Sequence, residues 1–411
     1  MDAPPTEELF AMHTRFVRNA VILGLISAIG PFAIDMYLPA LPTIGKSFTA
    51  DIGTVQLSLM LFFVSFGTFQ LIFGPISDMF GRKLPLYLGL VLFAAGGIGC
   101  AFAPDITTLN VFRFIQGIGA CAGMVIPRAV VRDLHTGIDA ARMMSLLMLV
   151  FSISPILAPV TGSLIINFAG WRAVFWVVTA AAVLGLILIA TMLPETRPKL
   201  ARVESGIGSA LSAYRLLLGD WNFLGLSFIG GFGIASFFVY LANSPFVLID
   251  HFGLTPTLYS IFFSINAVSF FAVAQFTGKL ADRFGLRRVV RVAVIGYFAA
   301  MTVLFALTTS GFDRLDVIAA CLFVGYGFLG LVIPTTAVLA MEEHGEIAGT
   351  ASALMGTLHF ATGAVAIAVI GLFADGTVLP MVAGIAACAL ITFILGQVTL
   401  RQRQAIEVPA E

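Results

Sequence analysis

Long apolar stretches alternate with short polar or Gly/Pro-rich breaks along most of the chain. A bilayer core about 30 Å thick needs roughly 20 apolar residues in a helix that crosses it. Twelve stretches of this kind can be read from the sequence, namely 18–41, 54–74, 84–103, 108–131, 143–168, 172–193, 221–248, 257–278, 289–309, 315–340, 350–374 and 377–399. The pattern predicts an all-α integral membrane protein with twelve transmembrane helices.

The composition indicates that lipid surrounds most of the chain. Apolar residues make up 59% of the 411 residues and charged residues only 11%, whereas soluble domains carry about 25% charged residues. Soluble cores of this size could not bury 38 Phe side chains without leaving large apolar surfaces. The same composition excludes a disordered chain, and a net charge of zero provides no basic surface for nucleic acid.

The distribution of Lys and Arg predicts the orientation in the membrane. If the N-terminus is cytoplasmic, most of the 22 Lys and Arg residues fall in cytoplasmic segments, as the positive-inside rule requires. Both termini are then cytoplasmic, because the number of spans is even. We expect a multi-pass protein of the inner (plasma) membrane of a bacterium.

One polar stretch divides the chain into two halves. Residues 194–220 form the only long polar segment between spans, and this segment is too short for a soluble domain. The sequence predicts an N-terminal six-helix bundle over 1–193, a cytoplasmic linker over 194–220 with a short surface helix, and a C-terminal six-helix bundle over 221–411.

The loops after spans 2 and 8 share a motif. Four residues of the first loop recur 204 positions later in the second, namely Gly74, Asp78, Phe80 and Gly81 as Gly278, Asp282, Phe284 and Gly285. This Gly-x-x-x-Asp-x-x-Gly loop, followed by basic residues and present once per half, resembles the signature of the major facilitator superfamily. The resemblance implies two six-helix bundles around a central cavity that opens to alternate sides.

The residues of the first loop have a physical interpretation of their own. Gly74 and Gly81 permit a tight turn, and Asp78 can face Arg82 or the N-terminus of another helix. The family resemblance implies that this helix is span 11, which starts near Gly349, and that the contact latches the cytoplasmic side shut. The alternative is a plain cytoplasmic turn with solvated charges.

The second loop departs from the motif. Leu286 replaces the basic residue that should follow Gly285. The latch role is therefore assigned to Asp282 and Gly285 on weaker grounds than to their counterparts in the first half.

Among the ionisable residues, Asp35 of span 1 and Arg113 of span 4 lie well inside their predicted spans. Such residues mark function by default. Each lies roughly six residues, or about 9 Å, from the outer boundary, and the inferred fold brings both spans to the cavity. We therefore expect the two charges to lie close together in water, with Gln116 and Gly117 on the same face as Arg113. The alternatives are a static buried salt bridge, or an Asp35 that is solvated at the outer rim.

The chemistry of this pair suits proton coupling. The protonation state of a carboxyl group depends on its contact with water and with nearby cations, so a cavity that opens and closes can load and unload Asp35. Arg113 stays protonated and acts as the fixed charge. Protons are the expected coupling ion, and no other cofactor or metal is predicted.

Further motifs point to one group within this superfamily. The segments that begin Asp35-Met-Tyr-Leu-Pro39, Arg113-Phe-Ile-Gln116-Gly117 and Arg128-Ala-Val-Val-Arg132-Asp133 resemble the bicyclomycin/chloramphenicol-resistance group of drug:proton antiporters.

Span 5 adds a further similarity to that group. It carries Pro155, Pro159 and Gly162 in an arrangement similar to the antiporter motif of the group, with departures at Ala158 and Ser163. As an alternative, the two prolines simply kink the span for packing.

Spans 7, 8 and 11 offer candidate ligand-binding residues, namely Phe238, Tyr240, Asn243, Asn266 and His359. Aromatic walls with few polar groups fit a lipophilic ligand. The sequence therefore predicts proton-coupled efflux of small amphipathic toxic compounds by a monomer that contacts only substrate and membrane lipid. The alternatives are a transporter of a specific metabolite or sugar and, more distantly, a receptor or membrane-embedded enzyme, for which no convergent catalytic set is found.

Overall fold

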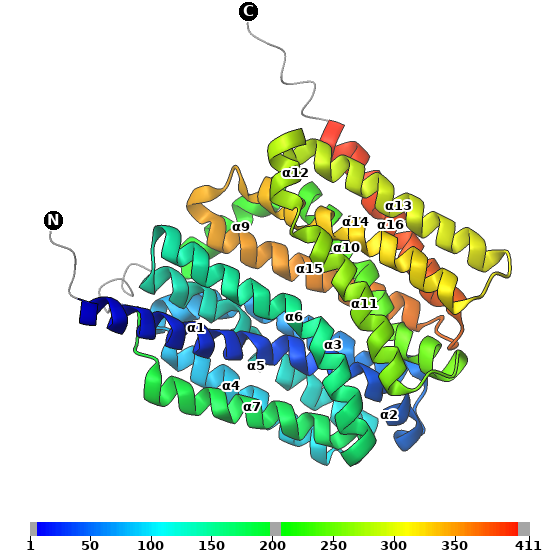
Figure 1. The fold of residues 1–411 in the computed structure, drawn as a ribbon, viewed down its shortest axis with the longest axis horizontal. Helices are drawn as coiled ribbons and strands as arrows, with labels where there is room; N and C mark the ends of the chain where they lie inside the picture. The colour runs from blue at the N-terminus through cyan, green and yellow to red at the C-terminus, as the bar shows by residue number, and fades with distance from the viewer. Residues whose placement is uncertain (1–5, 198–206, 402–411) are drawn as a thin grey trace, which may run out of the picture.

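The computed structural model describes residues 6–197 and 207–401, and every regular element in these ranges is a helix. Twelve helical segments within them are long and apolar enough to cross a membrane, which confirms the predicted fold class. The helices pack into two bundles that lie side by side (Figure 1).

The first bundle contains α1 (Thr6–Asp35), η1 (Leu38–Ala40), α2 (Leu41–Phe48), α3 (Ile52–Phe80), α4 (Lys83–Phe102), α5 (Ile106–Leu134), α6 (Gly137–Ala169) and α7 (Trp171–Met192). The second contains α10 (Trp221–Pro245), η2 (Phe246–His251), α11 (Pro256–Ala274), α12 (Thr277–Phe284), α13 (Leu286–Thr309), α14 (Leu315–Met341), η3 (Gly345–Ile347), α15 (Ala348–Gly371) and α16 (Val378–Arg401). Between them, α9 (Ile207–Gly219) lies within the predicted linker. The exact limits of bundles and linker stay a prediction.

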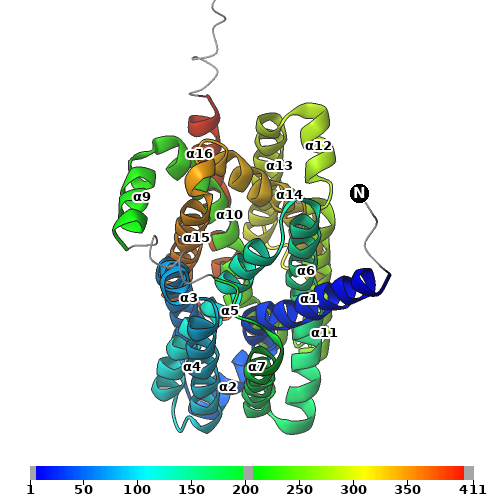
Figure 2. The same ribbon diagram turned by 90° about the vertical axis from the view of Figure 1, so that its left-hand side faces the viewer.

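Two seams join the bundles, one between α3 and α15 and the other between α6 and α11. We call the end of the molecule at which α1 begins and α16 ends the α9 end, and the opposite end the α2 end. Figure 2 shows α9 beside α3 and α15, with α2 at the other end.

Polar caps define where several helices begin. The Asp51 carboxylate accepts a hydrogen bond from the Thr54 amide at 2.8 Å, and Asp105 does the same for Thr108 at 2.8 Å. These bonds from the threonines lower the pKa of both carboxyl groups. Each cap satisfies amides that the first helical turn leaves without a partner.

The structure corrects the predicted end of span 1. The sequence pattern predicts one stretch over 18–41, but α1 ends at Asp35 and the chain continues through η1 into α2. Pro39 and Pro42 lie early in these two short helices, and proline cannot donate the hydrogen bond that would continue α1. Asp35 is therefore the last residue of a helix, at a bend in the chain.

The two motif loops are also mostly helical. Residues 74–80 belong to α3 and residues 278–284 to α12, and only Gly81 and Gly285 leave the helical conformation, with φ of 94° and 80°. Hydropathy marks where lipid ends, whereas a helix can continue into the polar interface because its backbone stays hydrogen-bonded. At Gly81 and Gly285 the positive φ explains the glycine.

Candidate functional site at the interface of the two bundles

Arg113 is held inside the first bundle by polar and aromatic contacts. Its side chain is 0% exposed, and Nη1 donates to Gln116 Oε1 at 2.8 Å and to the Ala33 carbonyl at 3.3 Å. The guanidinium carbon lies 4.3 Å from the Phe62 ring centre and 4.6 Å from that of Tyr37. The ring faces stabilise the cation, but Nε and Nη2 have no hydrogen-bond partner among the described residues.

Asp35 does not form the expected ion pair with Arg113. Its side chain is 5% exposed, and within 6–197 and 207–401 it has no hydrogen bond or salt bridge. It lies close enough to Tyr259 of α11 to act on that residue electrostatically. The expectation of a solvated pair is wrong for this conformation, because Asp35 ends α1 at the seam with the second bundle while Gln116 and two rings surround Arg113.

Glycines at two predicted positions permit close helix contacts around this pair. A Cβ atom on Gly162 of α6 would overlap the carbonyl oxygen of Met36, directly after Asp35. A Cβ on Gly117 of α5 would overlap Ser65 and the backbone of Phe62 in α3. These two glycines therefore set how closely α6 and α5 approach the chain around Asp35 and Arg113.

The antiporter-type segment of α6 also forms part of a seam. Pro155 and Pro159 lie inside this helix, and Ser260 of α11 donates to the Pro159 carbonyl at 2.8 Å. One turn away, Ser264 donates to the Ile156 carbonyl at 2.8 Å. Among the predicted motif residues, Pro159 thus contacts α11 of the second bundle, at the residue next to Tyr259.

Polar contacts close the α2 end between the bundles. Lys46 Nζ lies 2.7 Å from Asp250 Oδ1, and these residues are separated by the same 204 positions as the repeated motif. Deeper in the seam, Gln56 Nε2 donates to Asn243 Oδ1 at 2.9 Å and to the Ala242 carbonyl at 3.1 Å. One predicted residue, Asn243, therefore holds the bundles together.

Four phenylalanine rings meet at the centre of the interface, and we call them the four-ring cluster. Phe63 stacks on Phe238 with ring centres 4.3 Å apart, and Phe66 lies 4.7 Å from Phe360. The Phe360 ring also contacts Phe63 at 5.7 Å and Phe238 at 5.4 Å. Two rings come from α3 of the first bundle and two from α10 and α15 of the second, so a lipophilic molecule that separates the bundles would face this cluster.

Sequence analysis missed the contribution of α3. Gln56, Phe63 and Gln70 recur at seven-residue spacing, which places them on one helix face. All three meet the second bundle, Gln70 by close contact with Gly356 of α15. Two glutamines fourteen residues apart on one face of a predicted span are a signal that could have identified this face.

The remaining cavity candidates pair within the second bundle. Asn266 Nδ2 donates to the Tyr240 hydroxyl at 3.1 Å. His359 Nε2 lies 3.1 Å from the Ser227 carbonyl, and the imidazole is buried between α15 and α10. Their predicted roles in substrate binding stay predictions.

At the α9 end, Arg82 is the centre of a charged network. Its side chain is 3% exposed and bonds Asp78 Oδ1 at 2.7 Å, Ser77 Oγ at 2.8 Å, and both carboxylate oxygens of Asp133 at 2.7 and 3.1 Å. Burial alone would lower the pKa of Arg82, but the hydrogen bonds and charges of Asp133 and Asp78 outweigh it and raise the pKa. The predicted contact between Asp78 and Arg82 is confirmed.

The predicted contact between Asp78 and α15 is not formed in this conformation. Among described residues, the charged partners of Asp78 are Arg82 and, at 3.9 Å, Arg197. The residue close to the start of α15 is Arg132 of α5, because a Cβ on Gly349 would lie 3.4 Å from its Nη1. In this conformation polar contacts close the α2 end, and the latch contact implied by the family resemblance is absent among the described residues.

The second half lacks the network. Leu286 occupies the position 204 residues after Arg82, and an alkyl side chain cannot pair with Asp282. Asp282 is exposed and without an ion pair in the described ranges, and α12 contains no buried residue.

We expect Asp78→Asn to reduce transport at least several-fold while expression stays near the parent level. The amide keeps the shape of the carboxylate but removes a charge that faces Arg82 and that, by the family resemblance, is expected to face the helix terminus of α15 in another conformation. Transport in vesicles, normalised to protein amount, measures the effect. Asp139→Asn is the control, since Asp139 forms an exposed pair with Arg142 at 3.5 Å at the same end. Equal transport by both variants would make Asp78 an ordinary surface residue.

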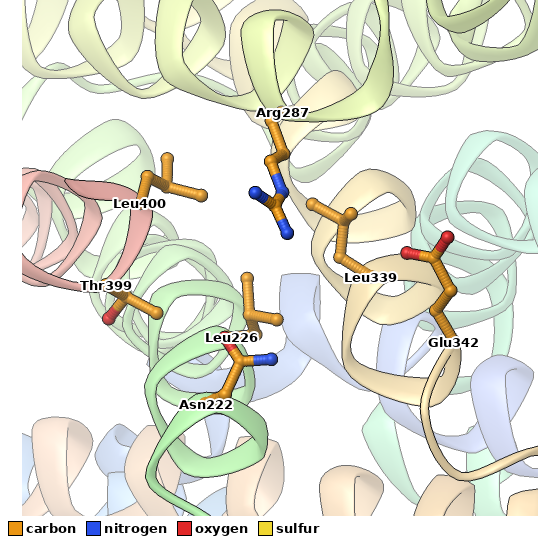
Figure 3. Close-up of a pocket in the computed structure, with 7 residues that line it drawn as sticks. All are labelled: Asn222, Leu226, Arg287, Leu339, Glu342, Thr399 and Leu400. Atoms are coloured by element: carbon orange, nitrogen blue, oxygen red, sulfur yellow. The ribbon is translucent and has the colours of Figure 1, made fainter. Parts of the chain in front are cut away.

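A separate pocket lies in the second bundle at the α9 end (Figure 3). The Arg287 guanidinium points into it, and the remaining lining residues are Asn222, Leu226, Leu339, Glu342, Thr399 and Leu400. None of the predicted site residues lines this pocket, which is distinct from the four-ring cluster.

Comparisons with known proteins agree with this architecture. Among solved structures, a D-xylose–proton symporter superposes with a TM-score of 0.71 over 92% of this chain and 97% of its own, at 16% identity, which shows a common fold.

Two relatives match nearly the full length of the chain. An uncharacterized MFS-type transporter of Bacillus subtilis, YdgK, is 37% identical over 92% of this chain and 93% of its own. The bicyclomycin resistance protein homolog of Haemophilus influenzae is 29% identical over 90% and 93%. The family description "Major Facilitator Superfamily" matches residues 23–368. The chain therefore belongs to the major facilitator superfamily.

Proposed function

We propose that this protein exports small lipophilic compounds across a bacterial inner membrane in exchange for protons. The observation that carries the proposal is Asp35, a buried carboxyl group at the seam between the bundles that has no hydrogen bond to any described residue. The name of the Haemophilus influenzae relative, a bicyclomycin resistance protein homolog, supports a drug as the substrate. The four-ring cluster supports a lipophilic one.

The distribution of basic residues supports a cytoplasmic α9 end. The α2 end then faces outward, and its polar contacts correspond to a conformation that is closed to the outside. Both termini and α9 are placed in the cytoplasm by this assignment.

Asp35 couples the proton to this movement. Opening the α2 end separates α11 from the end of α1, so water from outside reaches Asp35 and protonates it. The neutral carboxyl is less costly to bury than a carboxylate, and the α2 end can close again. A compound that enters from the cytoplasm and separates the rings of the four-ring cluster admits water, and Asp35 releases its proton inward. The proton-bound protein and the compound-bound protein thus favour different conformations, as coupled exchange requires.

Arg113 supplies the fixed positive charge in this scheme. Its contacts to Tyr37 and Phe62 hold the cation while Asp35 is neutral and faces the second bundle. When Asp35 loses its proton and water enters, Arg113 is the cation at matching depth that can attract the carboxylate. Protons are the coupling ion, no other cofactor takes part, and the monomer carries out transport rather than catalysis.

A sugar or metabolite transporter is the weaker alternative. The centre of the interface consists of phenylalanine rings, whereas a sugar site needs many polar groups to replace the hydrogen bonds of its hydroxyls with water. The likeness to the D-xylose–proton symporter concerns the fold alone.

We expect expression in an efflux-deficient bacterium to raise resistance to neutral or weakly charged lipophilic drugs more than to dications. The first bundle offers one acidic residue, Asp35, and one basic residue, Arg113, at the interface. A dicationic drug would find no second carboxylate there to pair with its second charge. Inhibitory concentrations across a panel matched for lipophilicity measure the preference, with Asp35→Asn as the inactive control. A profile dominated by divalent cations would contradict the expectation, and no resistance to any member would contradict drug export.

A further inference from the structure

A proline inside α3 leaves one backbone carbonyl without its helical partner. Pro75 lies within this helix, and proline has no amide hydrogen to donate to the carbonyl four residues earlier. That carbonyl belongs to Leu71, in the part of α3 that leads to the α9 end. A buried carbonyl without a partner costs free energy, so a donor from elsewhere would stabilise this bend.

The donor comes from the linker. The Tyr214 hydroxyl of α9 donates to the Leu71 carbonyl at 3.3 Å, in a partly buried position. In the described ranges, no side chain of another helix donates to the carbonyl four residues before any other proline inside a span, namely Pro31, Pro127, Pro155, Pro159, Pro245 and Pro334. The contact of Tyr214 is therefore specific to the bend in α3.

The same short helix contacts the second bundle. α9 packs against α15 and the start of α10, and Leu217 on its inner face is fully buried. Figure 2 shows α9 along the flank where α3 and α15 lie side by side. α9 thus contacts both sides of one seam at the α9 end.

The other face of α9 is apolar and exposed. Leu211 is 67% exposed, Leu216 and Leu218 are more than half exposed, and Trp221 directly after the helix is 84% exposed. Exposed apolar side chains of this kind fit contact with lipid, and tryptophan is typical of the membrane interface. Arg215 is also exposed on this face, and its long side chain can reach lipid headgroups. The occupant of this face is therefore lipid of the adjacent leaflet.

We propose that α9 is a lipid-embedded brace that holds the α3–α15 seam closed at the α9 end through the hydrogen bond from Tyr214 to the carbonyl freed by Pro75. The brace forms only while α3 and α15 are close at this end, because α9 cannot contact both after they separate. It therefore favours the narrower conformation of the seam. This inference rests on the contacts of α9 and is independent of what the protein transports.

The first test replaces Tyr214 by Phe, which removes only the hydroxyl. Spin labels on Cys substituted at Phe80 and Glu342, in a variant without native cysteines and in lipid nanodiscs, report the width of the α9 end. A net hydrogen bond of about 1 kcal/mol predicts that the ratio of wide to narrow states rises about fivefold in Tyr214→Phe. Tyr87→Phe is the control, because Tyr87 is half-buried and its hydroxyl has no hydrogen bond in the described residues.

The second test uses the proline. Pro75→Ala restores an amide that can donate to Leu71, so Tyr214→Phe should then leave the distance distribution unchanged. The brace is supported if Tyr214→Phe shifts the distance distribution towards longer distances when Pro75 is present and leaves it unchanged when Pro75 is replaced by Ala. No shift with Pro75 present, or equal shifts in both backgrounds, would overturn it. Thermal unfolding of each variant confirms that the labelled proteins are folded, and a wrong transport assignment would leave these distances unaffected.

Discussion

Asp35→Asn should abolish proton-coupled export, with a loss of ~100-fold or more, as for other groups that transfer a proton. The amide has the shape of the carboxyl group but cannot bind and release a proton at working pH. The fold should survive, because Asp35 makes no hydrogen bond or salt bridge in the described ranges whose loss would destabilise it. The decisive measurement is proton release on addition of drug to purified protein in detergent.

Asp51→Asn is the matched control for this prediction. Asp51 lies at the same end of the molecule and caps α3, and asparagine caps a helix about as well as aspartate. Proton release and export by Asp51→Asn should match the parent protein. Parent-like proton release by Asp35→Asn would place the coupling site elsewhere, and His359 would be the next candidate.

Arg113→Met should stop transport and leave the protein at least as stable as the parent. The methionine side chain fills much of the space between Tyr37 and Phe62, while two nitrogens of the arginine lack hydrogen-bond partners. Replacing a poorly paired buried charge by an apolar side chain is often neutral or stabilising by about 1 kcal/mol or more. Transport should fall by a factor of ten or more (about 1.4 kcal/mol), because the deprotonated Asp35 loses its counter-charge.

Arg172→Met tests whether the effect is specific to the buried arginine. Arg172 also stacks on an aromatic ring, 4.1 Å from the centre of Trp171, and donates to the Ala103 carbonyl at 3.1 Å, but its side chain is exposed. Its variant should transport normally. Export at the parent level by Arg113→Met would show that Asp35 needs no arginine. A lowered unfolding temperature together with lost export would assign Arg113 a structural role.

Hydropathy was sufficient to predict the number of spans. Twelve spans in two halves follow from the length of the apolar segments, and the repeated motif from a fixed offset of 204 residues, whereas two bundles around a central cavity were implied by the family resemblance. The predicted ends of the helices were less accurate than their number. The helix α3 continues through residues 74–80, beyond the predicted span, whereas α1 stops at Asp35, before the predicted span ends. Prolines that begin η1 and α2 were visible in the sequence and would have placed that stop.

Partners across helices could not be predicted in the same way. The depth of Asp35 and Arg113 suggested a pair, but depth does not fix the rotation of a helix about its axis, and the two side chains contact different neighbours. The bidentate contact of Arg82 with Asp133 joins residues 51 positions apart, and only packing reveals it. Tyr214 and Leu71 were likewise unremarkable as separate residues, since their relation depends on the missing amide of Pro75.

The charged network around Arg82 makes the two bundles mechanically unequal. Arg82 joins the end of α3 to α5 through Asp78 and Asp133, and its backbone amide bonds Glu195 after α7 at 2.8 Å. These contacts hold the end of α3, α5 and the segment after α7 together, so we expect the three to move as one rigid unit when the first bundle rotates. In the second bundle, Leu286 leaves α12 without such a tether, so α12 can swivel on Gly285 without breaking a salt bridge among the described residues. The end of α12 is therefore less constrained than the end of α3 in this conformation, although Gly, Asp, Phe and Gly recur at the same spacing in both halves.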